Sequence, residues 1–173
     1  MKARRKTTKR PAKNQKPIAS ARAGGLLKRQ NCVDSDATQH LPKRMDFSIG
    51  DAWGMEGLYL RFREGVLFQS NGSFGGVQPD QSKCVRYDPS KESWWQFWQD
   101  VERLGVWDWQ SQYQNDQVLD GTFWHLKLQH GGRRLQTEGY NAYPGADGPE
   151  CPVDCAFGQF LAALERLTGI KEI

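Results

Sequence analysis

The sequence predicts that one histidine and one glutamate lie opposite each other, where they could form an acid–base pair. Two consecutive glycines separate the runs Thr122–His130 and Arg133–Tyr140, in which apolar and polar residues alternate. Two glycines between such runs are typical of a two-residue β-hairpin, because both turn residues need positive φ. The implied register places His125 opposite Glu138. A carboxylate beside an imidazole raises the histidine pKa and can tune the ring for general acid–base catalysis.

The same pair has a structural interpretation, as an exposed cross-strand ion pair that fixes the register. We expect His125 to be accessible to solvent, with a pKa slightly above its ordinary value because of Glu138. The sequence lacks a Gly-x-x-x-x-Gly-Lys phosphate loop, a Gly-x-Ser-x-Gly elbow and a His-Glu-x-x-His motif. A non-catalytic binding domain is therefore the favoured function. A small enzyme that uses His125 and Glu138 is the alternative.

Two cysteines form the only closely spaced thiol pair in the sequence. Cys151 and Cys155 are separated by three residues, whereas Cys32 and Cys84 are isolated. Zinc ligands occur at such a spacing, but a structural zinc site needs a second pair. A metal site, a disulfide and unpaired thiols therefore all stay open for Cys151 and Cys155. We predict no cofactor.

The predicted hairpin also carries a candidate partner surface. Phe123 and Tyr140 share the sheet face that carries His125, and exposed aromatic side chains are typical of binding surfaces. Arg133 and Arg134 lie at the tip of the hairpin, where they could hold an acidic ligand. A solvated hairpin with no partner is the alternative.

A second candidate site lies on the opposite face of the same hairpin. Asn141 and Tyr143 continue the positions of Leu135 and Gly139, so they could outline a cavity between the sheet and a helix. A simpler interpretation is that Gly139 leaves room for Trp124 and that Asn141 binds the loop backbone.

The elements that position these residues follow from hydrophobic periodicity and turn residues. We expect strands at 58–63, 66–69, 84–87, 107–113, 122–130 and 133–140, a helix beginning at Asp88-Pro89 and ending at Gly105, and a second helix over 157–167 capped by Asp154 and ended by Gly169. The tight hairpins predict an α+β fold, with an antiparallel sheet of about 5–6 strands and two amphipathic helices on one face. The helix face that contains Trp94, Phe97 and Trp98 predicts a Trp-rich core.

The composition divides the chain at residue 44. Residues 1–44 hold 13 Lys and Arg against 2 Asp, a net charge of +11, and no Trp, Phe or Tyr. Residues 45–173 hold 11 Lys and Arg against 18 Asp and Glu, a net charge of −7. Without aromatic residues a segment cannot build a core, so we predict a disordered basic tail followed by one acidic domain.

Three origins stay open for the tail: an arm that contacts nucleic acid, an organellar presequence, or an extension upstream of a start at Met45. Nucleic acid contact through the tail would be nonspecific, since the tail has no rings that stack on bases. The acidic domain predicts a basic protein partner. No apolar run reaches the roughly 18 residues of a membrane span, and no secretory signal is evident, which predicts a cytoplasmic protein without membrane contact.

Overall fold

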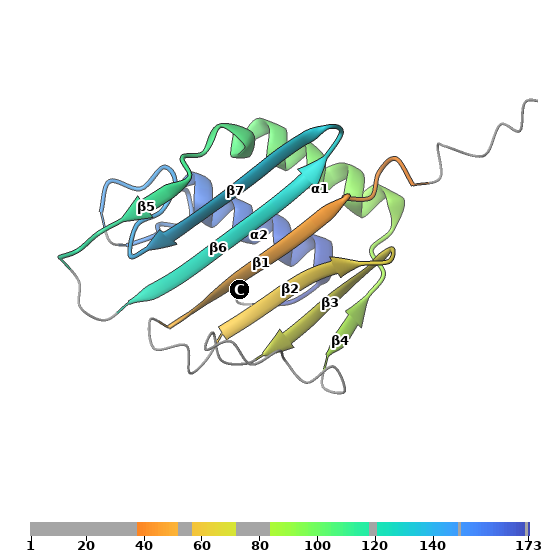
Figure 1. Cartoon of the computed structure of the whole chain (residues 1–173), viewed down its shortest axis with the longest axis horizontal. Coiled ribbons are helices and arrows are strands. Elements are labelled where there is room, and N and C mark those ends of the chain that lie inside the picture. The colour runs from red at the N-terminus through yellow and green to blue at the C-terminus, as the bar shows by residue number, and fades with distance from the viewer. Residues whose placement is uncertain (1–37, 52–56, 72–83, 118–120, 149, 172) are drawn as a thin grey trace, which may run out of the picture. The chain divides into compact units, whose positions relative to one another are not determined.

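The computed structural model describes residues 38–51, 57–71, 84–117, 121–148, 150–171 and 173. The chain divides into two units, Met1–Val33 and Asp34–Ile173, and all described residues belong to the second. Its strands are β1 (Arg44–Asp51), β2 (Gly57–Arg63), β3 (Val66–Asn71), β4 (Val85–Tyr87), β5 (Gln112–Gln114), β6 (Thr122–His130) and β7 (Arg133–Tyr140). Its helices are α1 (Lys91–Arg103), the 3₁₀ helix η2 (Val106–Asp108) and α2 (Ala156–Thr168). Figure 1 shows these elements in their chain order.

The strands form one sheet in the order β4-β3-β2-β1-β6-β7-β5. All neighbouring strands are antiparallel except β5, which runs parallel to β7. The α+β class is therefore confirmed. The sheet differs from the prediction in two respects, because it has seven strands and is mixed.

The central strand β1 is absent from the predicted elements. It pairs with β2 on one side and with β6 on the other, so it joins the two hairpins into one sheet. Its sequence alternates apolar Met45, Phe47 and Ile49 with Asp46 and Ser48. This alternation with a period of two is the signal that identifies β1.

The two tight hairpins agree with the sequence. In the β6–β7 turn, Gly131 and Gly132 have φ values of 55° and 83°. In the β2–β3 turn, Glu64 and Gly65 have φ values of 51° and 85°. Both turns thus have the two positive φ values that match the twist of paired strands. The register of β6 and β7 is confirmed, with His125 opposite Glu138.

The predicted strand over 107–113 is wrong for residues 107–111, and only Gln112 and Tyr113 belong to a strand, β5. Gly105 has a φ of 61°, and the chain then forms η2 before the three residues of β5. Trp107 and Trp109 alternate in sequence as strand residues would, but both pack against the core from the connection after α1. The two tryptophans alternate in the sequence because both indole rings pack against the core, and not because they belong to one strand.

Both long helices begin at a cap other than the predicted one. Ser90, not Asp88, caps α1, and its side chain accepts a hydrogen bond from the backbone N–H of Ser93. Cys155, not Asp154, caps α2, and its Sγ accepts from the N–H of Gly158. The predicted stop of α2 at Gly169 is confirmed by its φ of 76°.

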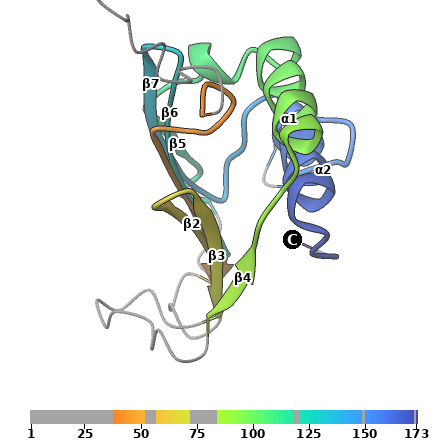
Figure 2. The ribbon, with the colours of Figure 1, turned by 90° about the vertical axis from the view of Figure 1, so that its right-hand side faces the viewer.

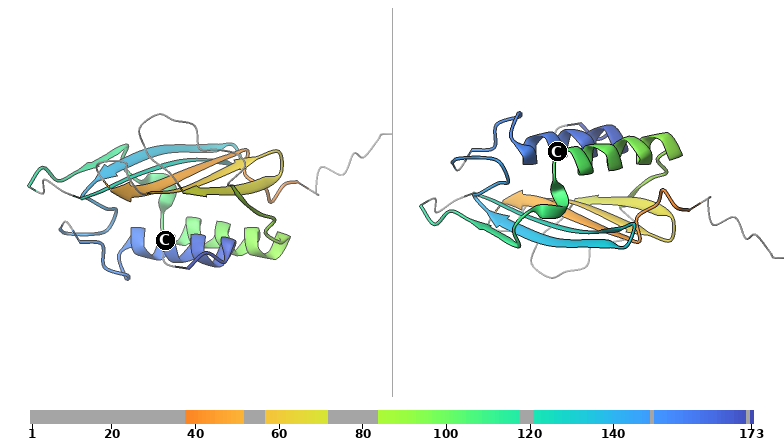
Figure 3. Two further views of the ribbon diagram at one scale, coloured as in Figure 1. Left: turned by 90° about the horizontal axis from the view of Figure 1, so that it is seen from below. Right: turned by 90° about the horizontal axis from the view of Figure 1, so that it is seen from above.

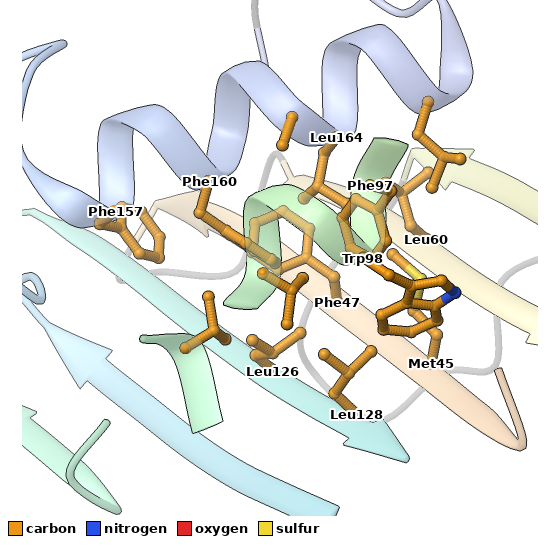
Figure 4. Packing of buried hydrophobic residues seen from close by; sticks show 14 of the residues in the cluster. Met45, Phe47, Leu60, Phe97, Trp98, Leu126, Leu128, Phe157, Phe160 and Leu164 are labelled. Atoms are coloured by element: carbon orange, nitrogen blue, oxygen red, sulfur yellow. The ribbon is translucent and has the colours of Figure 1, made fainter. Parts of the chain in front are cut away.

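The two helices lie side by side on the same side of the sheet (Figures 2 and 3). Their aromatic side chains meet the strands there, since Phe160 of α2 contacts Phe47 of β1 and Trp94 of α1 contacts Phe62 of β2. Figure 4 shows this packing between helices and sheet. The predicted Trp-rich core is confirmed. The largest side chains with less than 2% exposure are Trp94, Trp124, Phe47, Phe97, Phe157, Phe160, Met45, Leu60, Leu67, Leu126, Leu128 and Leu164.

The residues directly before β1 contact the domain. The indole N–H of Trp98 donates to the carbonyl oxygen of His40 at 2.7 Å, and Nδ1 of His130 lies 3.2 Å from the carbonyl oxygen of Leu41. The N–H of Lys43 donates to the carbonyl oxygen of Gln129. Residues 1–37 lie outside the described part of the chain, so the basic tail stays a prediction.

No helix among the described residues is both long enough and apolar enough to cross a membrane.

Candidate functional site

The sheet has two faces, and the candidate acid–base pair lies on the one turned away from the helices. Trp124, Leu126 and Leu128 of β6 are at most 1% exposed and face the helices, so the residues between them face the other way. We call this second side the outer face. Its residues are Arg44, Asp46, Ser48, Gly50, Gly57, Tyr59, Arg61, Arg63, Val66, Phe68, Ser70, Arg86, Gln112, Gln114, Phe123, His125, Lys127, Gln129, Arg134, Gln136, Glu138 and Tyr140.

One row across the outer face holds three residues of types that are common in catalytic sites. Ser48 of β1, His125 of β6 and Glu138 of β7 occupy consecutive register positions. Gln112 of β5 extends the row, and its Nε2 donates to Oε1 of Glu138 at 3.2 Å. Within the described residues, no hydrogen bond joins His125 to Ser48 or Glu138. The row therefore brings a hydroxyl, an imidazole and a carboxylate close together without a formed proton relay.

His125 is half-buried, and this reverses the expected direction of its pKa. Burial lowers the pKa of His125 first, the positive charge of Lys127 adds to the decrease, and Glu138 opposes it. The expectation of a slightly raised pKa through Glu138 is therefore wrong. The desolvation of the imidazolium outweighs one neighbouring carboxylate, because a charge that leaves water is costly. At neutral pH the neutral ring is favoured.

The outer face is basic, although the domain is acidic. Its basic residues are Arg44, Arg61, Arg63, Arg86, Lys127 and Arg134, and its acidic residues are Asp46 and Glu138, a net charge of +4. Residues 44–173 together hold 12 Lys and Arg against 18 Asp and Glu, a net charge of −6. The acidic residues therefore lie mostly on the helices and in the connections.

Asp46 lies between two of the arginines of the outer face. Its carboxylate accepts from Nε of Arg44 at 2.7 Å and from Nε of Arg61 at 2.9 Å. One carboxylate is thus paired with two guanidinium groups. The other bases, such as exposed Arg86 and Arg134, contribute the remaining positive charge of the face.

Aromatic rings lie among these charges. Phe68 is half-buried between the register positions of Arg61 and Arg86. Phe123 and Tyr140, both candidates from the sequence, are direct cross-strand partners on the same face. Burial raises the pKa of Tyr59, so its phenol stays protonated at neutral pH. The outer face thus combines flat rings with guanidinium and ammonium groups.

The arginines at the hairpin tip separate onto opposite sides of the sheet. Arg134 lies on the outer face, but Nη1 of Arg133 binds both carboxylate oxygens of Glu102 in α1, at 2.7 and 2.8 Å. The Arg133 guanidinium also lies 4.8 Å from the ring centroid of Trp107. His130 stacks on Trp98 with ring centroids 3.9 Å apart. The four binding candidates of the hairpin therefore divide, with Phe123, Tyr140 and Arg134 together and Arg133 on the helix side.

Asn141 and Tyr143 have structural positions. Asn141 has a φ of 50°, is 3% exposed, and its Oδ1 accepts from the N–H of Thr122 at 2.9 Å. Tyr143 is 8% exposed and packs on Phe157. Gly139 leaves room for Trp124, because a Cβ there would lie 2.2 Å from the indole Nε1. These contacts fit the simpler interpretation, and the groove found in the described chain lies in the loop before α2 instead.

The two cysteines of the close pair come together. Sγ of Cys151 and Sγ of Cys155 are 3.1 Å apart, and both are thiols. Among the described residues no group of three or more His, Cys, Asp or Glu is arranged to hold a metal ion. A cysteine pair alone supplies two of the four ligands that structural zinc takes.

Several residues of the outer face are absent from the sequence-based candidates. Arg44, Arg61, Lys127 and Arg86 come from four strands, and only the sheet brings them together. The signal that was present in the sequence is alternation, since Arg61, Lys127 and Arg86 each lie between apolar or aromatic residues of their strand.

No protein-family model matches the chain, and no curated protein is similar to it in sequence. Its function must therefore be inferred from the geometry and charge of the chain itself.

Proposed function

We propose that the chain is a non-catalytic binding domain, that its outer face is the binding surface, and that its partner is single-stranded nucleic acid. The observation that carries the proposal is the net charge of +4 on the outer face of a domain whose net charge is negative. Phosphate groups are the natural counterpart of such a surface.

The aromatic rings of the outer face favour nucleic acid over other anions as the partner. Surfaces that bind single strands combine basic side chains along the backbone with aromatic rings on which bases stack. Phe68 lies on the outer face between the register positions of Arg61 and Arg86, and Phe123 lies on the same face opposite Tyr140. A polyphosphate or an acidic peptide without rings would use the charges and not the aromatic residues.

The two layers of the domain support a single-sided binding surface. The helices lie on the inner side of the sheet, and Arg133 and His130 are held there by Glu102 and Trp98. The bases of the outer face are thereby separated from the helix layer, where Arg133 is paired with Glu102. This separation also changes the partner expected from composition, since a basic protein would be repelled by the outer face.

The basic tail, +11 over residues 1–44, adds to such binding without specificity. Its contribution must be held constant in a test of the outer face. We therefore compare variants of the full chain, all with the same tail, by the fluorescence anisotropy of a labelled oligothymidylate.

Lys127→Gln and Arg134→Gln should each weaken binding several-fold and reduce the slope of log K against log salt by about 0.7, the value for one phosphate contact on a single strand. The matched control is Lys91→Gln, which removes the same charge from an exposed position on α1. If all three variants bind alike, the tail accounts for the binding and the outer face is not the site.

Phe68→Leu tests the ring separately from the charge. Loss of stacking should cost about 1–3 kcal/mol of binding free energy per base, and the melting temperature shows whether the fold is retained. Unlabelled polyphosphate serves as a competitor without bases. If polyphosphate competes as well as the oligonucleotide at equal charge, the partner is a general polyanion and the nucleic acid proposal is wrong.

One observation favours the alternative, a small enzyme that uses His125 and Glu138. The row on the outer face adds Ser48 beside His125. Both β1 and β6 have neighbours on each side, so their backbone N–H groups are used in the ladder and do not offer an oxyanion hole. Hydrolysis of an activated ester tests this alternative. A loss of roughly 100-fold or more in His125→Asn would favour the enzyme over the binding domain.

A further inference from the structure

We propose that Cys151 and Cys155 are a redox-active dithiol, which closes to an intramolecular disulfide by exchange with a cationic disulfide bound in the adjacent groove. This function is separate from the outer face, because it involves the loop before α2 and the first turn of that helix.

The geometry of the two thiols supports the exchange. Their sulfur atoms are 3.1 Å apart in the reduced state, so a disulfide needs an approach of only about 1 Å. Only three residues of chain separate them, and Cys155 is fixed as the N-cap of α2. The pair is therefore held in register for closure without movement of the core.

The two cysteines have different environments. Sγ of Cys155 accepts a hydrogen bond from the N–H of Gly158 at 3.2 Å, at the positive end of the α2 dipole. Both features place partial positive charge beside the Cys155 sulfur. Burial raises the pKa of Cys151 to about 12, the hydrogen bond to Cys155 and its charge add to this increase, and the N–H of Gly158 opposes it. We assign Cys155 as the nucleophile because it lines the adjacent groove, whereas burial keeps Cys151 protonated until the second step.

A side chain at position 158 would clash with the loop that joins the two cysteines. A Cβ on Gly158 would lie 2.5 Å from the carbonyl oxygen of Pro152, within the loop that joins the two cysteines. Glycine therefore lets the chain between Cys151 and Cys155 fold back onto the first turn of α2, where the N–H of residue 158 reaches the sulfur.

A groove of about 490 Å³ lies beside Cys155. Its lining residues are Gly145, Ala146, Asp147, Gly148, Glu150, Pro152, Asp154 and Cys155. Cys155 is only 6% exposed, but it lines the groove, so an external disulfide bound there can reach its sulfur. Three of the lining residues are acidic and none is basic, so the groove favours a cationic ligand.

The chemistry is thiol–disulfide exchange in two steps. The Cys155 thiolate attacks one sulfur of the external disulfide, forms a mixed disulfide and releases one thiolate. Cys151 then loses its proton and attacks Sγ of Cys155, which releases the second thiolate. The two protons of the protein thiols end on the two released groups. The protein pair is oxidised by two electrons, and the external disulfide is reduced to two thiols.

Equilibration of the full chain with mixtures of cystamine and cysteamine tests closure. Free thiols are trapped with a maleimide and counted by intact mass. Two of the four cysteines should lose reactivity together, and peptide mapping should join Cys151 to Cys155. Cys84→Ser should leave this loss unchanged. Retention of every thiol across the whole series, or a link through Cys84, would overturn the proposal.

Single cysteine variants test the order of the two steps. Cys151→Ser should accumulate a stable mixed disulfide at Cys155. Cys155→Ser should form one at Cys151 more slowly, because burial raises the pKa of the Cys151 thiol and leaves less of it as the reactive thiolate. Circular dichroism confirms that both variants fold. Equal rates, or a faster reaction at Cys151, would contradict the assignment of Cys155 as nucleophile.

The charge of the external disulfide tests the groove. Cystamine is cationic, hydroxyethyl disulfide is neutral and oxidised glutathione is anionic. Their rates, each divided by the rate of the same disulfide with a small neutral thiol to remove the effect of the leaving group, should decrease in that order at low salt and converge at high salt. Glu150→Gln should reduce the preference for cystamine. Glu64→Gln, which changes an exposed glutamate in the β2–β3 turn, is the matched control. Equal normalised rates for the three disulfides would show that the groove does not bind the oxidant.

Discussion

The inner and outer faces of the sheet are built from alternate residues of the same strands, yet different interactions dominate them. On the inner face, Phe47, Trp124 and Leu126 are at most 1% exposed and pack against α1 and α2. On the outer face, their chain neighbours Asp46 and Lys127 lie among charges. The inner face therefore responds to shape and volume, and the outer face to charge and pH.

Residues of the same type show the difference most clearly. Trp98 lies in the core and Trp95 is 60% exposed, although both belong to α1. His130 stacks on Trp98 on the inner side, whereas His125 lies on the outer face. Each pair therefore allows the same substitution to be made once against the core and once away from it.

The largest expected effect is the loss of Trp98. Trp98→Ala removes a buried ring, its hydrogen bond to the carbonyl oxygen of His40 and its stacking on His130. We expect it to lower the free energy of unfolding by about 3–5 kcal/mol. Urea denaturation monitored by circular dichroism gives the value.

Trp95→Ala is the matched control, and it should change the free energy of unfolding by only about 0.5 kcal/mol. Similar small effects at both positions would show that this helix face is not part of the core, and would remove the distinction between the two faces.

A smaller loss of stability is expected from a substitution at Gly139, where the inner face has no room for an added methyl group. In Gly139→Ala, the new Cβ would meet Nε1 of Trp124 at 2.2 Å and the carbonyl oxygen of Ala142 at 2.6 Å. The indole N–H of Trp124 donates to that same carbonyl oxygen, so the ring cannot move without loss of the bond. We expect a destabilisation of about 1–3 kcal/mol, measured as a shift of the urea midpoint.

Gly148→Ala provides the comparison, because a Cβ at Gly148 meets nothing within 4 Å. It should leave the midpoint unchanged within error. A neutral Gly139→Ala would mean that Trp124 has room to repack, and that the close fit of the hairpin to the core is not required.

The smallest expected effect is the pH dependence from the two histidines. Burial lowers the pKa of both His125 and His130. The unfolded chain, with a histidine pKa of about 6.5, then binds protons that the folded state does not. The free energy of unfolding should therefore be highest above about pH 6.5 and should fall as the pH decreases toward the folded-state pKa values.

Urea midpoints between about pH 7 and pH 5 measure this slope above the range in which most carboxylates titrate. His125→Asn and His130→Asn should each reduce it, and the NMR titration of each ring gives its pKa directly. A ring of His125 that titrates above its ordinary value would show that Glu138 outweighs burial, and would make the outer face more open than the inner one.

Part of the fold was predictable because it depends on local signals. Two consecutive glycines determined the turn and register of β6 and β7, and the 3.6-residue spacing of Trp94, Phe97 and Trp98 identified the buried face of α1. Of the two interpretations that the sequence left open for Gly139, the structure agrees with space for Trp124. Turn conformation and helix amphipathicity are properties of neighbouring residues, so the sequence alone shows them.

The candidate site was only partly predictable. The sequence placed Phe123, Tyr140 and His125 on one face but also grouped Arg133 with them, and the ion pair with Glu102 in α1 holds Arg133 on the other side. The bases that make the outer face positive come from separate strands. Their proximity depends on β1, a strand that joins the two hairpins and was missed.

The sequence by itself determined the α+β class, the two hairpins, the helix faces and the difference in charge between the two parts of the chain. The tertiary structure alone decided the central place of β1, the parallel pairing of β5, the half-burial of His125 and the contact between Cys151 and Cys155. The reason is physical. Local conformation follows from the residue and its neighbours, whereas burial, strand order and pKa depend on segments that are distant in the sequence.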